Sequence, residues 1–275
     1  NRGLLLRMRA LPLFLVVLIS VFECCSGVVK ILCIGDSITA GGTPFSNVKG
    51  RTYRVQLRKD LEARVPGEFE FVGNGCDGCK TDASKVSDKR CDFGCKSKLD
   101  NNFLAFWGWT ASQMVEGNGK EYTRTDGLGK KVPPHGMAQW VEKLDFDVAL
   151  IHLGTNDLGH GKTKERIFTD VSRIVEVLRA KNPKVSVLIA QIIPYKRGVN
   201  KVVDLNKYVA DHAPSISTEE SPVIVANCFQ GVNNTHLVDG IHPGEEGAAI
   251  MARSWEKQLF PLLETKYGLK VKPPA

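Results

Sequence analysis

The 275-residue sequence has no internal repeat, no low-complexity linker and no cluster of basic residues. The absence of repeats and linkers excludes a solenoid or a string of small modules, and 43% hydrophobic residues are ample for a core. The formal net charge is +7, but lysine and arginine are scattered, as on a solvated surface, and no nucleic-acid-binding motif occurs. We therefore expect a monomer with one globular domain and no nucleic-acid partner.

The N-terminal hydrophobic run, residues 11–22, is shorter than the roughly 20 residues that a membrane-spanning helix needs. Arg7 and Arg9 precede it, and the small residues Cys25 and Gly27 follow it, which is the layout of a secretory signal peptide. We predict a signal peptide over residues 1–27, no stable membrane insertion, and an extracellular or secretory-lumen location.

Six of the eight cysteines remain once residues 1–27 are removed, and four of the six lie in one segment, as Cys76, Cys79, Cys91 and Cys95. Their spacing resembles that of a structural zinc site, whereas an oxidising secretory compartment favours disulfides. On the compartment argument we predict disulfides, with the pairing open. Cys33, inside the first apolar run, and Cys228, at the end of the last one, are expected to be buried thiols.

Apolar runs and amphipathic segments alternate along most of the chain. Buried strands are predicted at residues 28–35, 69–75, 148–153, 184–194 and 221–228. Helices are predicted at residues 53–65, 164–181, 201–213 and 245–263. Near-continuous apolar strands joined by helices indicate an α/β fold with a five-stranded parallel sheet covered on both faces.

Residues 74–135 interrupt this alternation, because they are rich in Gly, Lys, Asp and Cys and show little periodicity. They contain too few apolar residues for a core of their own, so we interpret them as an insertion and not as a second domain. The cysteine-rich part of the insertion is placed at about residues 74–104, within a domain spanning residues 28–264. Residues 265–275 form a C-terminal tail, and its end, KVKPPA (270–275), is expected to be frayed.

Two polar residues directly follow predicted strands. Ser37, in Gly-Asp-Ser, comes after the first strand, where open α/β sheets bind their ligands. It is either a nucleophile or, with Asp36, part of a helix cap. Asn156, in Gly-Thr-Asn-Asp, follows the third strand and is either part of the same site or a turn residue.

A carboxylate and an imidazole, Asp239 and His242, lie three residues apart just before the last helix. A carboxylate at that spacing can fix the tautomer of the imidazole, which can then accept the proton of a serine hydroxyl. Gly108, in FWGWTASQM, is by itself best read as a turn glycine. Phe103 and Phe106 are expected in the core, whereas Trp107 and Trp109 are either core residues or a rim for stacking sugars.

Four segments, GDSIT, the Gly of WGWTAS, GTND and DGIHP, resemble those of the SGNH, or GDSL-type, hydrolases and occur in that family's order. The resemblance covers residues 28–264 and implies a three-layer α/β/α sandwich with the flavodoxin-like strand order 2-1-3-4-5. It implies Ser37 as nucleophile, His242 as base and Asp239 as the acid that orients it. The implied oxyanion-hole donors are the backbone N–H groups of Ser37 and Gly108 and the side-chain amide of Asn156.

Within this family the chain is most similar to secreted carbohydrate esterases of the acetylxylan-esterase type, through FVGNG, GWTASQM, VALIHLGTNDLG, AQIIPY and DGIHPGEEGAAIMA. The resemblance implies a secreted serine esterase that hydrolyses short acyl esters, above all acetyl, on carbohydrate such as acetylated xylan. Ser37 would carry the acyl group. The alternatives are a lipid or lysophospholipid esterase of the same fold, and a catalytically silent carbohydrate-binding homologue.

The remaining histidines indicate no metal site, since they lack partners at metal-ligand spacing, and no cofactor is expected. His152, inside the third strand, is expected in the core. The sequon at Asn233 predicts a site for N-linked glycosylation in a secreted chain.

Overall fold

The computed structural model describes residues 27–41, 51–73, 102–119, 122–123, 131–132 and 135–274. Residues 1–26 of the predicted signal peptide lie outside the described residues, as do the four cysteines predicted to form disulfides, Cys76, Cys79, Cys91 and Cys95.

Five parallel strands form the centre of the fold, in the order β2-β1-β6-β7-β8. This arrangement confirms the predicted strand order. The strands are β1 (Val29–Gly35), β2 (Phe69–Val72), β6 (Val148–His152), β7 (Ser186–Gln191) and β8 (Val223–Asn227).

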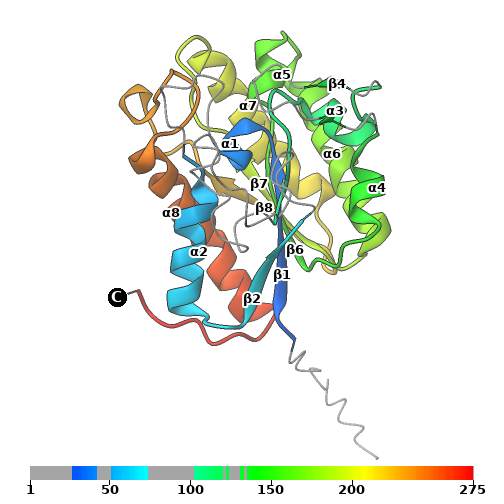
Figure 1. Ribbon diagram of the computed structural model, residues 1–275, viewed down its shortest axis with the longest axis vertical. Coiled ribbons are helices and arrows are strands. Elements are labelled where there is room, and N and C mark those ends of the chain that lie inside the picture. The colour runs from blue at the N-terminus through cyan, green and yellow to red at the C-terminus, as the bar shows by residue number, and fades with distance from the viewer. Residues whose placement is uncertain are drawn as a thin grey trace, which may run out of the picture.

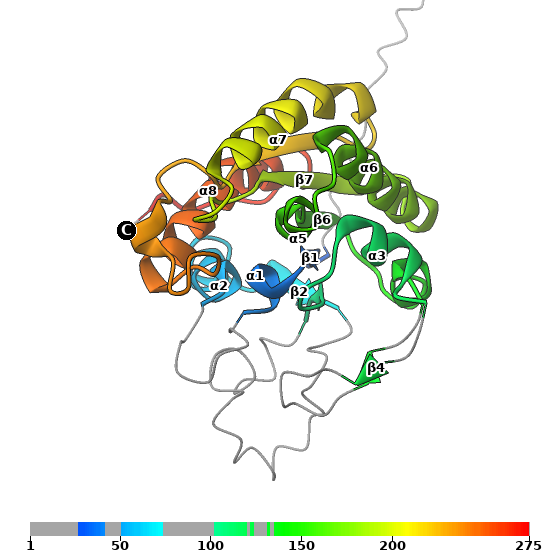
Figure 2. The same ribbon diagram turned by 90° about the horizontal axis from the view of Figure 1, so that it is seen from above.

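Helices cover both faces of the sheet (Figures 1 and 2), which confirms the three-layer architecture. Successive residues of β1 point to opposite faces, with Leu32 and Ile34 in one core cluster and Ile31 and Cys33 in the other. One face packs against α3 (Ala111–Glu116), α4 (Met137–Val141), α6 (Lys164–Lys181) and α7 (Val199–His212). The other packs against α2 (Tyr53–Arg64) and α8 (Glu245–Thr265).

Short helical segments lie at the ends of these elements: α1 (Ser37–Ala40), α5 (Thr155–Gly159), η2 (Ala213–Ile216) and η3 (Asn234–His236). The long helix α6 has the predicted bounds, and the side chain of Thr163 caps it by accepting a hydrogen bond from Arg166 N. None of the helices among the described residues combines the length and the apolar character that crossing a membrane requires.

Part of the region that we predicted as an insertion belongs to the main fold. The strand β3 (Leu104–Ala105) pairs in parallel with the end of β1, at Ile34 and Gly35, and adds a sixth strand that the sequence analysis missed. Phe103 and Phe106 flank it and are buried, as expected. The segments β4 (Tyr122–Thr123) and β5 (Lys131–Val132) form a separate antiparallel pair.

The prediction of a frayed end is wrong at Lys272. Lys272 N donates to Arg64 O at 3.0 Å, and Arg64 Nε donates to Lys272 O at 2.7 Å. These two bonds attach the tail to the end of α2. Cys33 and Cys228 are buried free thiols, as predicted, and burial raises the pKa of Cys33 to about 12.

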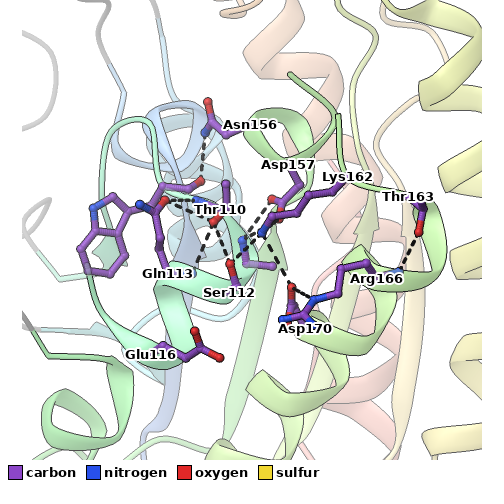
Figure 3. Close-up of polar contacts among 12 residues, drawn as sticks. Thr110, Ser112, Gln113, Glu116, Asn156, Asp157, Lys162, Thr163, Arg166 and Asp170 are labelled. Carbon is purple, nitrogen blue, oxygen red and sulfur yellow. Dashed lines mark hydrogen bonds and ion pairs between the residues drawn. The ribbon is translucent and has the colours of Figure 1, made fainter. Parts of the chain in front are cut away.

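Buried charges join three of the helices (Figure 3). Asp157 in α5 and Asp170 in α6 are both 0% exposed. Lys162 lies between them, with Nζ 3.0 Å from Asp157 Oδ1 and 3.7 Å from Asp170 Oδ2, and it donates to Ser112 Oγ in α3 at 2.7 Å. The Asp157 carboxylate also accepts a hydrogen bond from Ala111 N, at the start of α3. Asp157 is therefore a structural residue, which holds α3 against α5 and α6.

We expect Lys162→Met to lower the free energy of unfolding by about 3 kcal/mol, because it leaves the buried Asp157 carboxylate without a cation. Asp170 keeps Arg166 and Arg173 as ion-pair partners, so the loss falls mainly on Asp157. The matched control is Lys201→Met, at an exposed position of α7, with an expected change within about 0.5 kcal/mol. Urea unfolding of both variants measures the difference, and equal midpoints would contradict the stabilising role of Lys162.

Candidate active site

The carboxyl ends of β1 and β6 bring the two predicted strand-end residues to the same edge of the sheet. Ser37 is the first residue of α1, directly after β1, and Asn156 lies in α5, directly after β6. The chain turns tightly between β1 and α1, because a Cβ on Gly35 would lie 2.1 Å from Thr39 Oγ1. Only glycine fits there, and this tight turn places Ser37 at the end of the strand.

Ser37, His242 and Asp239 form a continuous hydrogen-bonded chain. Ser37 Oγ lies 2.7 Å from His242 Nε2, and His242 Nδ1 lies 2.7 Å from Asp239 Oδ2. Ser37 is 9% exposed and His242 is 7% exposed. With a proton on Nδ1 facing the carboxylate, Nε2 is free to accept the serine proton, which is the arrangement that activates a hydroxyl as a nucleophile.

Hydrogen bonds within the loop fix the positions of Asp239 and His242. Val238 N donates to His242 O at 2.9 Å, and Asp239 Oδ1 accepts from the backbone N–H groups of Ile241 and His242. Burial by itself raises the pKa of Asp239, but the hydrogen bonds from the His242 backbone, the His242 ring and the Ile241 backbone outweigh it, so the pKa is below its usual value. The carboxylate is therefore ionised next to the imidazole at neutral pH.

Asn156 lies near Gly108, because its side chain contacts Trp109, the residue that follows Gly108. Asn156 Nδ2 donates to Trp109 O at 3.0 Å and to Asp36 Oδ2 at 3.1 Å. Gly108 is exposed and has a φ of +76°, a left-handed conformation that suits glycine in the turn before α3. The structure thus brings together the segments that carry the predicted triad and oxyanion-hole residues.

Asp36 is a site residue whose contact with Asn156 the sequence analysis missed. Its side chain is 0% exposed, and Oδ1 accepts a hydrogen bond from Ile38 N at 2.9 Å, which is the cap that the sequence suggested. Burial is the main reason why the pKa of Asp36 is raised to about 7, and the nearby Asp157 raises it further. The Gly-Asp-Ser motif predicted that Asp36 caps the following helix, but it did not predict the contact with Asn156.

The structure distinguishes the two tryptophans next to Gly108, which the sequence left as either core residues or a rim for stacking sugars. Trp109 is 1% exposed and stacks on Phe106 with ring centroids 4.1 Å apart, so it is a core residue, whereas Trp107 is half-buried. His152 is fully buried below the site, as expected, and burial lowers its pKa to about 4. His152 is therefore neutral.

Asn233 is exposed, and Asn233 Oδ1 accepts hydrogen bonds from the backbone and the hydroxyl group of Thr235. Among the described residues, no three histidine, cysteine, aspartate or glutamate side chains gather as they would around a metal ion.

Comparison with known proteins identifies the family. The profile of the GDSL-like Lipase/Acylhydrolase family matches residues 33–250. A multidomain esterase from Ruminococcus flavefaciens is 25% identical over 255 residues, which are 88% of this chain and 30% of that protein. The chain therefore spans about a third of the length of this relative.

Solved structures share the fold. A carbohydrate esterase family 3 protein from Talaromyces cellulolyticus superimposes with a TM-score of 0.64 at 23% identity, covering 86% of this chain and 99% of the other. A family 3 carbohydrate esterase from Clostridium thermocellum has a TM-score of 0.60 at 19% identity, covering 88% of this chain and 100% of the other. A mutant acetyl esterase crystallised with an acetate ion has a TM-score of 0.61 at 23% identity, covering 86% and 99%.

The family profile covers far more than half of the chain, and the esterase relative and the structural neighbours agree with it. The chain belongs to the GDSL-like lipase/acylhydrolase family of SGNH hydrolases and is a carboxylic ester hydrolase.

Proposed function

We propose that this hydrolase removes short acyl groups, above all acetyl, from carbohydrate such as acetylated xylan, with Ser37 as nucleophile, His242 as base and Asp239 as the acid that orients it. The observation that carries the proposal is the hydrogen-bonded chain from Ser37 Oγ through the imidazole of His242 to Asp239. A serine hydroxyl is a weak nucleophile at neutral pH and needs such a base.

The reaction proceeds in two halves. Ser37 Oγ attacks the ester carbonyl while its proton passes to His242 Nε2, and the carbonyl π electrons move onto oxygen. The C–O bond to the sugar then breaks, and His242 gives its proton to the leaving alkoxide, so an acyl-serine remains. Water, deprotonated by His242, attacks this acyl group, and Ser37 leaves with the proton to restore the hydroxyl.

The carbonyl oxygen becomes negatively charged in both acylation and deacylation, and hydrogen-bond donors that already point toward it stabilise this charge. The proposed donors are the backbone N–H groups of Ser37 and Gly108 and the side-chain amide of Asn156. Amides donate without carrying a charge, and a donor aimed at the developing oxyanion stabilises the transition state more than the ground state.

Support for a carbohydrate substrate comes from the structural neighbours, two of which are carbohydrate esterases of family 3, and from the acetyl esterase with its acetate ion. Support for secretion comes from the signal-peptide layout of residues 1–27. In that compartment we continue to expect disulfides among the insertion cysteines and a glycan at Asn233.

A lipid esterase is the second candidate, and one observation favours it. Two apolar side chains next to the triad carboxylate, Val238 and Ile241, are 38% and 40% exposed. They lie on either side of Asp239 in sequence, where they could contact an acyl chain.

Replacing the nucleophile tests the mechanism. We expect Ser37→Ala to lower kcat for p-nitrophenyl acetate by on the order of 10⁵- to 10⁶-fold, because the hydroxyl is needed to form the acyl-enzyme. Ser215→Ala, at an exposed serine of η2, is the matched control and keeps full activity. Turnover by Ser37→Ala within tenfold of the wild-type rate would show that Ser37 is not the nucleophile.

Acyl-chain length tests the substrate class. We expect kcat/KM to fall as p-nitrophenyl esters lengthen from acetate to octanoate, since each methylene gains roughly 0.8 kcal/mol only where a pocket buries it. Acetate release from acetylated xylan is expected to exceed fatty-acid release from lysophospholipid. A rise with length that Ile241→Ser abolishes would instead establish the lipid esterase, with the exposed valine and isoleucine as its acyl site.

A further inference from the structure

The side-chain amide of Asn156 joins the segments that carry all the proposed oxyanion donors. One of its acceptors, Asp36 Oδ2, belongs to the residue before Ser37, and the other, Trp109 O, belongs to the residue after Gly108. In Figure 3, Asn156 lies above Thr110 and Asp157, at the edge of the polar contacts between α3 and α6. Any change in the orientation of this amide therefore affects how the three donors are placed relative to one another.

Both acceptors of the amide are oxygen atoms, and this fixes which end of the amide faces them. In the observed orientation Nδ2 donates to Asp36 Oδ2 and to Trp109 O. A flip of the side chain would place Asn156 Oδ1, which can only accept, against the Asp36 carboxylate and the Trp109 carbonyl. Of these two acceptors, Asp36 favours the amide hydrogens more strongly in its ionised form, because a charge-assisted hydrogen bond is roughly twice as strong as a neutral one. With a pKa of about 7, Asp36 is about half ionised at neutral pH.

The capping function of Asp36 does not explain why a carboxylate stands at this position. Asp36 Oδ1 accepts from Ile38 N and caps α1, but serine, threonine or asparagine would cap a helix equally well. The carboxyl group is fully buried, with a pKa raised to about 7 by desolvation, so keeping a carboxylate there opposes folding. The oxygen that the cap does not use, Oδ2, is the one that holds Asn156.

We propose that Asp36 is a positioning residue for ester hydrolysis, which holds the amide of Asn156 so that Nδ2, and not Oδ1, is the end of the amide available to the reacting carbonyl. The inference rests on the proposed function, in which Asn156 is an oxyanion donor. Asp36 does not touch the substrate and acts only through Asn156.

The two hydrogen bonds of the amide have different roles in this account. The bond to Asp36 orients the side chain throughout the reaction. The two amide hydrogens are fixed relative to each other, so the bond to Asp36 also sets the direction of the second hydrogen. This second hydrogen, which Trp109 O accepts, is the one shared with the oxyanion, since a neutral carbonyl is a weaker competitor for it than a carboxylate. A flipped amide would instead present Oδ1 to the negative oxygen and repel it.

A double-mutant cycle tests the inference. The single variants are Asn156→Ala, Asp36→Asn and Asp36→Ser, where serine keeps a cap for α1 but cannot reach Asn156 as a carboxylate does. We expect Asn156→Ala to lower kcat for p-nitrophenyl acetate by about 100- to 1,000-fold and each Asp36 variant to lower it at least about tenfold, with KM within about threefold. Circular dichroism and thermal unfolding establish that each variant is folded.

The decisive comparison is the double variant Asp36→Ser/Asn156→Ala. If Asp36 acts through Asn156, its removal costs nothing further, and kcat stays within about threefold of that of Asn156→Ala. A product of the two single losses, or an Asp36→Ser enzyme with unchanged kcat, would overturn the inference. Ser37→Ala is measured alongside the cycle. If it is inactive, the proposed function holds whatever the cycle shows, whereas an active Ser37→Ala enzyme shows that the proposed function itself has failed.

Discussion

The parallel pairing of β1 with β6 determines where the site forms. Gly35 lies opposite His152 at the end of both strands, so the residues that follow, Ser37 and Asn156, emerge at the same edge. This edge is also the switch point of the sheet, since β1 has β2 on one side and β6 on the other. Open α/β sheets bind ligands at such points because the connections leave in opposite directions there. The remaining site residues reach this edge from loops.

Four carboxylates lie in or next to these connections, and they compensate for their lost hydration in three ways. Asp157 and Asp170 have cations, since Lys162 lies between them. Asp36 is held by two N–H donors, Ile38 N and Asn156 Nδ2, and its pKa rises as a result of burial. Asp239 is partly exposed and strongly hydrogen-bonded, so its pKa falls. The same residue type thus serves as a structural anchor, a cap and the ionised partner of a histidine.

Much of the fold could be predicted from the sequence because the signals were local and repeated. The bounds of α6 and the presence of five strands follow from apolar periodicity, whereas the strand order was implied by the resemblance to SGNH hydrolases. The contact between Asp239 and His242 follows from their three-residue spacing within one loop. The strand β3 could not be predicted, since two residues carry no period. The ion pairs of Lys162 and the hydrogen bond from Asn156 to Asp36 depend on tertiary packing, which places residues distant in sequence within reach of one another.

The central claim is that Ser37, activated by His242 and Asp239, is the nucleophile of this ester hydrolase. The most direct measurement is to inactivate the enzyme with diethyl p-nitrophenyl phosphate, which phosphorylates an activated serine, and to locate the label by peptide mapping. The account predicts one label per chain, on Ser37, forming in step with the loss of activity and absent from a folded His242→Ala variant. Complete loss of activity with the label on another residue, or full activity with Ser37 labelled, would contradict it.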